Sequence, residues 1–245
     1  MTDGVRTELS VVIDSVVRMR EAQVWAQPDA GALAAAAIGA GADGVLLSLY
    51  ATHVAARDRS PEMLGEFGGR LCVAATLQPI LLQATLASAA QQCVIIPGAR
   101  HEHSSGGSLA VQVVREALLS ARALLAQRDI EVAARIDPEL EAVECCHELG
   151  LRAVEFNTAR YALAARRETR ERRFAELSNC AAAAREAGMR VSLRGGLNFD
   201  NVGAFAMLEG VSEVRVGQAL IAAALFDGIQ TSIAKMRGLL GGRTQ

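Results

Sequence analysis

Two carboxylates and one arginine stand where they could act on a small molecule. Asp14 follows the apolar run Leu9–Ile13, Glu155 lies inside Ala153–Asn157, and Arg194 ends a third apolar run. Carboxylates can transfer protons and a guanidinium can hold an anion, so we treat all three as candidate catalytic residues. A carboxylate in an apolar strand is costly to bury unless it is paired, so we expect Glu155 to face a polar opening. A structural salt bridge is the alternative for Glu155, and binding of loop amides is the alternative for Asp14.

Glycines follow two of the apolar runs at positions suited to an anion. Gly195 and Gly196 come directly after the arginine, and Gly217 and Gln218 come directly after Glu213–Val216. Backbone without a Cβ atom can approach a ligand closely, and a helix N-terminus attracts phosphate. We therefore predict that these four residues bind a phosphorylated small molecule. The alternative is that the glycines serve only tight turns.

The histidines and cysteines give no comparable signal. His101 and His103 lie in the long loop Pro97–Gly107, which offers a metal ion no preset geometry, so we expect no metal site. The five cysteines form no CxxC pair and leave one over, which favours reduced thiols over a disulfide framework. No GxGxxG or Walker A motif appears in an expected strand-to-helix turn, which weakens a nucleotide-binding interpretation, and we predict no cofactor.

The elements that position these residues alternate along the whole chain. Eight short apolar runs are expected as strands: Leu9–Ile13, Gly44–Leu49, Leu71–Thr76, Cys93–Ile96, Ile130–Ile136, Ala153–Asn157, Arg190–Leu193 and Glu213–Val216. Helices are expected between or after them: Pro28–Ala40, Pro61–Glu66, Gln78–Ala90, Ser108–Gln127, Pro138–Glu148, Glu168–Ala187, Asn201–Leu208 and Ile229–Leu240. Eight alternations favour a (β/α)8 TIM barrel, with an open doubly wound sheet as the alternative.

Size and charge limit the class of protein. The 245 residues are 51% hydrophobic, which suits one domain over residues 1–245. A formal net charge of −2 gives no reason to expect nucleic acid or a membrane surface as a partner. No apolar run reaches the ~20 residues of a membrane span, and the polar first residues lack the pattern of a signal peptide. We expect a cytoplasmic protein.

Four segments together resemble the pyridoxine 5′-phosphate synthase family. They are Val12–Asp14, Val154–Tyr161, Arg194–Val202 and Val216–Ala219, and the resemblance runs from about Leu9 to Leu240. It implies a TIM barrel with extra helices, assembly as a homo-oligomer, and closure of the Pro97–Gly107 loop over the substrate. It also implies ligand-binding roles for residues after the second and sixth strands. These are Tyr50, His53, Arg57, Asn157 and Thr158. Tyr50 stands where the family has an arginine and Asn157 where it commonly has a histidine, and a solvated surface turn is the favoured interpretation of the region around Arg57.

The resemblance also carries a mismatch. The family places two histidines and a glutamate at its catalytic centre, and these positions correspond to Ser48, Gly195 and Ala74. A serine cannot shuttle protons near neutral pH as imidazole can, and the other two residues have no group to do so. Three hypotheses remain open: a diverged enzyme acting on a small, possibly phosphorylated molecule; a non-catalytic protein that binds such a ligand or a partner; and a true pyridoxine 5′-phosphate synthase with relocated catalytic groups.

Overall fold

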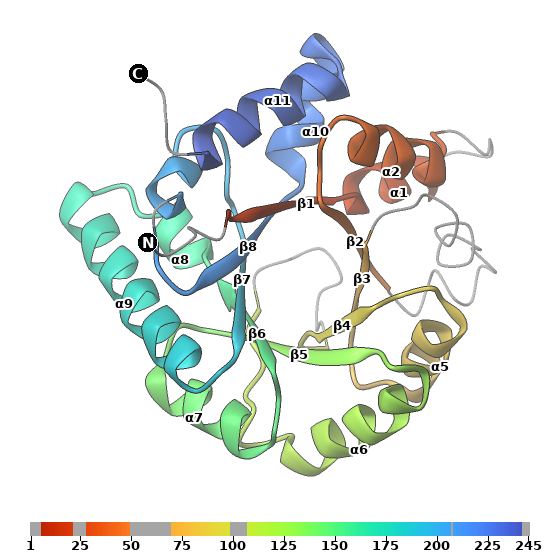
Figure 1. Ribbon diagram of the computed structural model, residues 1–245, viewed down its shortest axis with the longest axis vertical. Helices are drawn as coiled ribbons and strands as arrows, with labels where there is room; N and C mark the ends of the chain where they lie inside the picture. Colours follow the sequence, from red (N-terminus) through yellow and green to blue (C-terminus); the bar gives the residue numbers. More distant parts are fainter. Residues whose placement is uncertain (1–5, 22–27, 50–69, 99–106, 207, 242–245) are drawn as a thin grey trace.

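Eight parallel strands close into a barrel in the order of the sequence (Figure 1). The computed structural model describes residues 6–21, 28–49, 70–98, 107–206 and 208–241. The strands are β1 Glu8–Val12, β2 Gly44–Ser48, β3 Arg70–Ala75, β4 Gln92–Ile95, β5 Glu131–Ile136, β6 Ala153–Asn157, β7 Arg190–Arg194 and β8 Val211–Val216. Pairing of β1 with β8 closes the ring, so the TIM barrel is confirmed and the open sheet is excluded.

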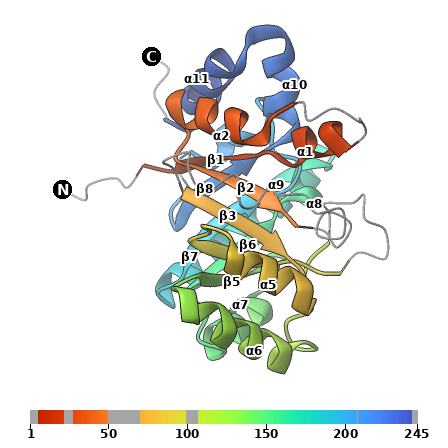
Figure 2. The ribbon, with the colours of Figure 1, turned by 90° about the vertical axis from the view of Figure 1, so that its right-hand side faces the viewer.

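Helices surround the barrel (Figure 1). In the described parts of the chain they are α1 Asp14–Glu21, α2 Ala30–Gly39, α5 Pro79–Ala87, α6 Arg115–Leu125, α7 Leu140–Glu148, α8 Ala159–Ala162, α9 Arg167–Glu186, α10 Gln218–Asp227 and α11 Ile229–Leu240. Turned by 90°, the ribbon shows α1 and α8 at the end of the barrel toward which the strands point (Figure 2). In barrels of this kind that end carries the functional site.

Alternation along each strand sends residues to two different environments. In β6, Val154 and Phe156 belong to the main core between strands and helices, whereas Ala153 belongs to a smaller apolar cluster inside the barrel. The other members of that inner cluster are Val12, Leu46, Cys72, Ala74, Val94 and Ala133, with Ile96 packed against it. The inner cluster draws most of its residues from β1–β4. The side of the barrel interior formed by β5–β8 instead carries charged residues.

Three helices that the sequence did not predict follow β1, β6 and β8. Helices α1 and α8 have only eight and four residues, too few for a repeating pattern to be recognised, and α10 has the nearly uniform sequence QALIAAALFD, which shows no period of 3.6 residues. Conversely, the helix expected over Asn201–Leu208 is a short 3-10 helix, Val202–Phe205. The expected helix Pro61–Glu66 lies outside the described residues.

Two expected helix starts are wrong for reasons that involve the site. The helix expected from Ser108 begins only at Arg115, because the backbone N–H of Leu109 donates to the carbonyl of Arg135 and holds this segment along β5. The helix expected from Pro138 begins at Leu140, since the Asp137 carboxylate accepts hydrogen bonds from other elements instead of capping this helix. In contrast, α5 begins at Pro79 with Gln78 before it, as predicted.

No helix among the described residues combines the length and apolar character needed to cross a membrane. Glycines expected at helix C-termini are confirmed at Gly41, Gly150 and Gly188, which have φ angles of 100°, 69° and 72°.

Candidate functional site

A cavity of about 480 Å³ opens at the C-terminal ends of β1, β7 and β8. Its lining includes six of the predicted site residues: Asp14, Arg194, Gly195, Gly196, Gly217 and Gln218. Arg18, on α1, and Arg215, on β8, also line it. Most small-molecule sites occupy roughly 300–1,000 Å³, so the cavity has the size of a ligand pocket.

Asp14, Ser48 and Arg194 form one hydrogen-bonded group at this cavity. The Ser48 hydroxyl donates to Oδ2 of Asp14 at 2.7 Å, and its backbone N–H donates to Oδ1 at 2.8 Å. Arg194 Nη2 donates to Oδ2 of Asp14 at 2.9 Å and to Ser48 Oγ at 3.0 Å. These contacts join the start of α1 to the ends of β2 and β7, so Asp14 binds a backbone amide of β2 and also lines the cavity.

The loop after β7 is held by hydrogen bonds to its carbonyl groups. Thr158 Oγ1 donates to the carbonyl of Gly195 at 2.7 Å, and Asn201 Nδ2 donates to the carbonyl of Gly196 at 3.1 Å. Tyr161 in turn donates to the carbonyl of Asn201 and packs edge-on against Phe205. The peptide planes of the two glycines are therefore fixed without any ligand.

Backbone geometry explains why glycine is needed in these loops. Gly195 has φ of 132°, and a Cβ atom there would lie 2.8 Å from Asn157 Oδ1. Gly196 has φ of 69°, and a Cβ atom there would lie 2.7 Å from the Cβ of Ala162. At Gly217 a Cβ atom would approach that of Val12 to 3.0 Å. Tight turns therefore account for Gly195 and Gly196, whereas the close approach of Val12 accounts for Gly217, and all three residues also line the cavity.

Helix α10 begins at the cavity. Gly217 is its N-cap residue, and the cavity is lined by Gly217, Gln218 and Ala219. The first N–H groups of a helix have no partner within the helix and carry a partial positive charge. Together with Arg18 and Arg194, this makes the β1–β7–β8 side of the mouth suited to an anion.

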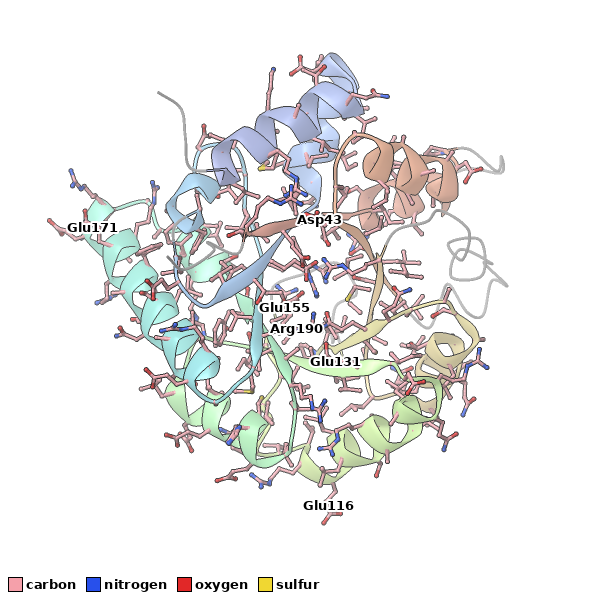
Figure 3. All side chains as sticks on the ribbon, in the orientation of Figure 1. Asp43, Glu116, Glu131, Glu155, Glu171 and Arg190 are labelled. Atoms are coloured by element: carbon pink, nitrogen blue, oxygen red, sulfur yellow. The ribbon has the colours of Figure 1, made fainter. Side chains whose placement is uncertain are left out.

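Glu155 does not face the mouth, so that expectation is wrong. Its side chain is 0% exposed inside the ring of strands, whereas Glu116 and Glu171 project outward from helices (Figure 3). Glu155 Oε2 accepts from Arg215 Nη1 at 2.9 Å, and Oε1 lies 3.5 Å from Arg135 Nη1. The structural salt bridge considered for this residue is therefore the arrangement found, and it leaves the carboxylate without access to the cavity.

The charged side of the barrel interior is balanced. Arg135, Arg194 and Arg215 are buried there beside the largely buried acids Asp14, Glu155 and Glu213, which gives three positive and three negative groups. Burial would raise the pKa of Glu213, but the Arg215 guanidinium and hydrogen bonds from Arg215 and Ser10 hold it below its usual value. Burial raises the pKa of Cys72 to about 12, so its thiol stays protonated at neutral pH and is a poor nucleophile.

Asn157 and Thr158 support the mouth from the side. Asn157 Nδ2 donates to Ser108 Oγ at 3.1 Å and to Asp137 Oδ1 at 3.3 Å, which ties β6 to the segment before α6. Asn157 Oδ1 accepts from the N–H of Ala159. Neither Asn157 nor Thr158 is among the residues that line the cavity. Their predicted contact with a ligand stays a prediction.

Several predicted features fall outside the described residues: Tyr50, His53, Arg57, and the interior of the Pro97–Gly107 loop with His101 and His103. The two ends of that loop are close together, since a Cβ atom on Gly107 would lie 2.8 Å from Pro97 Cγ. Ala74 is fully buried in the apolar cluster inside the barrel. Within the described ranges, no three His, Cys, Asp or Glu side chains are grouped as metal ligands would be.

Two of the arginines inside the barrel were not predicted from the sequence. Arg135 and Arg215 are each 2% exposed, and each pairs with Glu155. Their signal was available, because charged residues alternate with apolar ones in Ala134–Ile136 and in Glu213–Val216. In a strand covered by helices, such alternation marks residues that point into the barrel.

Comparison with known proteins gives a family for the chain. The family model described as "Pyridoxal phosphate biosynthesis protein PdxJ" matches residues 9–242. Pyridoxine 5′-phosphate synthase of Gluconobacter oxydans is 34% identical over 95% of this chain and 98% of its own length. The enzyme of the same name from Syntrophotalea carbinolica is 30% identical over 96% and 98%.

Among solved structures, the tryptophan synthase alpha subunit of Legionella pneumophila superposes with a TM-score of 0.61 at 14% identity, covering 97% of this chain and 94% of that one. At this identity the likeness concerns the fold alone. The match over nearly the whole chain and the identities of 30% and above show that the protein belongs to the PdxJ family of pyridoxal phosphate biosynthesis proteins.

Proposed function

We propose that this protein binds a small phosphorylated molecule at the barrel mouth and does not form pyridoxine 5′-phosphate by the acid–base route of its family. The phosphate would sit against Gly195, Gly196 and the N-terminus of α10, with Arg18 beside it. The observation that carries this proposal is the cavity itself, which gathers the two glycine loops, a helix N-terminus and three arginines.

The second half of the proposal rests on the groups that could transfer protons. Where the family is expected to carry two histidines and a glutamate, this chain has Ser48, Gly195 and Ala74. Ser48 is held between Asp14 and Arg194, and Glu155 is held between two buried arginines. A positioned general acid or base typically contributes ~10²–10⁴ in rate, so the loss of three such groups removes most of the catalysis of that reaction.

A diverged enzyme is the second candidate, and one observation favours it. Asp14 lines the cavity, and its carboxylate lies within hydrogen-bond distance of Arg194. A carboxylate next to bound phosphorylated substrate could accept a proton from a carbon or hydroxyl group. The carboxylate of Asp14, with Arg194 stabilising a developing negative charge, would then carry the altered chemistry.

The cellular compartment and the oligomeric assembly of the protein are part of the same proposal. All five cysteines are buried and unpaired, which supports a reducing compartment such as the cytoplasm. Leu225 and Phe226 are exposed near the end of α10, and such apolar side chains support assembly into a homo-oligomer. No metal or cofactor enters the proposal.

The test measures binding and turnover separately. Titration calorimetry with inorganic phosphate, glycerol 3-phosphate and pyridoxine 5′-phosphate should show binding, and each ligand at a hundred times its Kd should stabilise the fold by ~2.7 kcal/mol. An Ala219→Asp variant places a carboxylate in the cavity and should weaken phosphate binding at least tenfold. Ala222→Asp, on the exposed side of the same helix, is the matched control and should bind as the wild type does.

Turnover is assayed with 1-deoxy-D-xylulose 5-phosphate and 3-amino-2-oxopropyl phosphate. We expect no pyridoxine 5′-phosphate above background. Clear formation of that product would refute the second half of the proposal, and equal binding by the wild type and Ala219→Asp would refute the first half. Consumption of a phosphorylated compound that is abolished by Asp14→Asn would establish the diverged enzyme.

A further inference from the structure

Two arginines lie side by side on the floor of the mouth cavity. Arg194 of β7 and Arg215 of β8 are register partners on neighbouring parallel strands, and both side chains point into the barrel and line the cavity. They are 6% and 2% exposed. Strands in a sheet are about 4.8 Å apart, so the two side chains leave their strands close together.

Each of these guanidinium groups has a nitrogen that the surrounding side chains do not satisfy. Arg194 uses Nη2 for Asp14 and Ser48, and Arg215 uses Nη1 for Glu155 and Nη2 for Glu213 and Gln92. Arg194 Nη1 and Arg215 Nε are buried and have no hydrogen-bond partner among the residues that the structure describes. A buried N–H group left unpaired is destabilising, and more so on a charged group, so each of these two nitrogens calls for an acceptor.

We propose that this floor is a second subsite, which takes the carboxylate of a phosphorylated carboxylic acid. The inference rests on the proposed function, since the phosphate of the same molecule would occupy the glycine loops and the start of α10. The carboxylate would accept hydrogen bonds from Arg194 and Arg215. The ligand would thus span the cavity from its rim to its floor.

A carboxylate fits the floor better than a second phosphate or a neutral group. Its two oxygens match two N–H donors, and charge-assisted bonds of this kind are about twice as strong as neutral ones. Three arginines already face three acids there, so a phosphate dianion would add two unbalanced negative charges to the floor and a carboxylate only one. A monoanion also loses less solvation on burial than a dianion does.

Ordered water is the competing explanation for the two nitrogens. Buried waters commonly satisfy such groups, and a cavity of about 480 Å³ has room for them. If water fills the floor in every complex, a ligand with a carboxylate should bind no more tightly than one with a hydroxyl group at the same place. The two explanations therefore differ in one measurable quantity, the preference for a carboxylate at fixed phosphate.

The experiment compares glycerol 3-phosphate with 3-phosphoglycerate, which has a carboxylate in place of a hydroxymethyl group. Calorimetry on the wild-type protein should give a Kd for 3-phosphoglycerate at least tenfold lower. Arg194→Lys keeps a positive charge for Asp14 but loses the second terminal nitrogen, so the preference should fall to about threefold or less. Any effect of Arg194→Lys on phosphate binding acts on both probes, so the ratio of the two Kd values is the quantity compared. Arg172→Lys, an exposed arginine on α9, is the matched control and should keep the full preference.

The outcomes separate this inference from the proposed function. Equal Kd values for the two probes, with both binding, would overturn the carboxylate subsite and leave the phosphate site standing. A preference that survives unchanged in Arg194→Lys would also overturn it, because the arginine would then not be the recognising group. Failure of both probes and of inorganic phosphate to bind would overturn the proposed function and the inference together.

Discussion

Replacing Glu155 by glutamine tests whether this carboxylate is structural or functional. The change keeps the shape of the side chain but removes the charge that faces Arg215 at 2.9 Å and Arg135 at 3.5 Å. All three side chains are at most 2% exposed, so water cannot replace the lost partner.

The expected loss of stability follows from this burial. Breaking a buried ion pair by removing one partner typically costs 3–5 kcal/mol, because the remaining charge stays buried without compensation. We expect Glu155→Gln to lower the free energy of unfolding by about 3 kcal/mol or more. For a chain of this size each kcal/mol shifts Tm by roughly 2–4 °C, so Tm should fall by about 6 °C or more.

Urea unfolding followed by circular dichroism measures this difference as a change in midpoint at constant slope. Glu148→Gln is the matched control, since Glu148 makes an exposed pair with Arg115 and such pairs contribute about 0–1 kcal/mol. Adding Arg135→Gln to Glu155→Gln removes an uncompensated positive charge. The free energy of unfolding of the double variant should therefore fall by less than the sum of the decreases in the two single variants. A loss below about 1 kcal/mol for Glu155→Gln would refute the reasoning, because the charges would then not be desolvated. The Kd of the folded Glu155→Gln variant for phosphate should stay within a few-fold of the wild-type value. Substitution of a residue that contacts the ligand would raise this Kd much further.

Two further predictions concern the site loop and the barrel interior. Gly195→Ala should destabilise the fold by about 1–3 kcal/mol, because φ is 132° and the new Cβ would meet Asn157 Oδ1, whereas Gly39→Ala, in open space at the end of α2, should cost nothing in the same urea titration. A loss at Gly39 equal to that at Gly195 would contradict this. The pKa of Glu213 is held below its usual value of 4.5, so its contribution to stability is present above pH 4.5 and is lost as the pH falls through the lowered pKa. The Tm difference between wild type and Glu213→Gln should therefore shrink as the pH falls below about 4.5, with exposed Glu209→Gln as control. A constant difference would show that Glu213 is not the titrating group.

The strands could be predicted from the sequence because burial on both faces gives nearly continuous apolar runs, such as Leu71–Thr76. The cavity glycines and Asp14 could be placed because parallel strands all present their C-terminal ends at one rim. The partners of Glu155 could not, since they depend on register across the closed barrel, which no local pattern encodes. Helix α10 escaped prediction because its apolar side chains surround the helix and give no period.

The balanced charges inside β5–β8 constrain how this barrel can evolve. Any single substitution that removes a charge from Arg135, Arg194, Arg215, Asp14, Glu155 or Glu213 leaves this largely buried set with one unbalanced charge. A lineage that exchanges one of them must change a second at nearly the same time, or else cross an unstable intermediate. Among relatives, the charged interior residues should therefore be substituted in pairs, while the apolar interior residues of β1–β4 should be substituted one at a time. Paired substitutions on neighbouring strands, rather than residue identity at single positions, should therefore show how this site has changed among relatives.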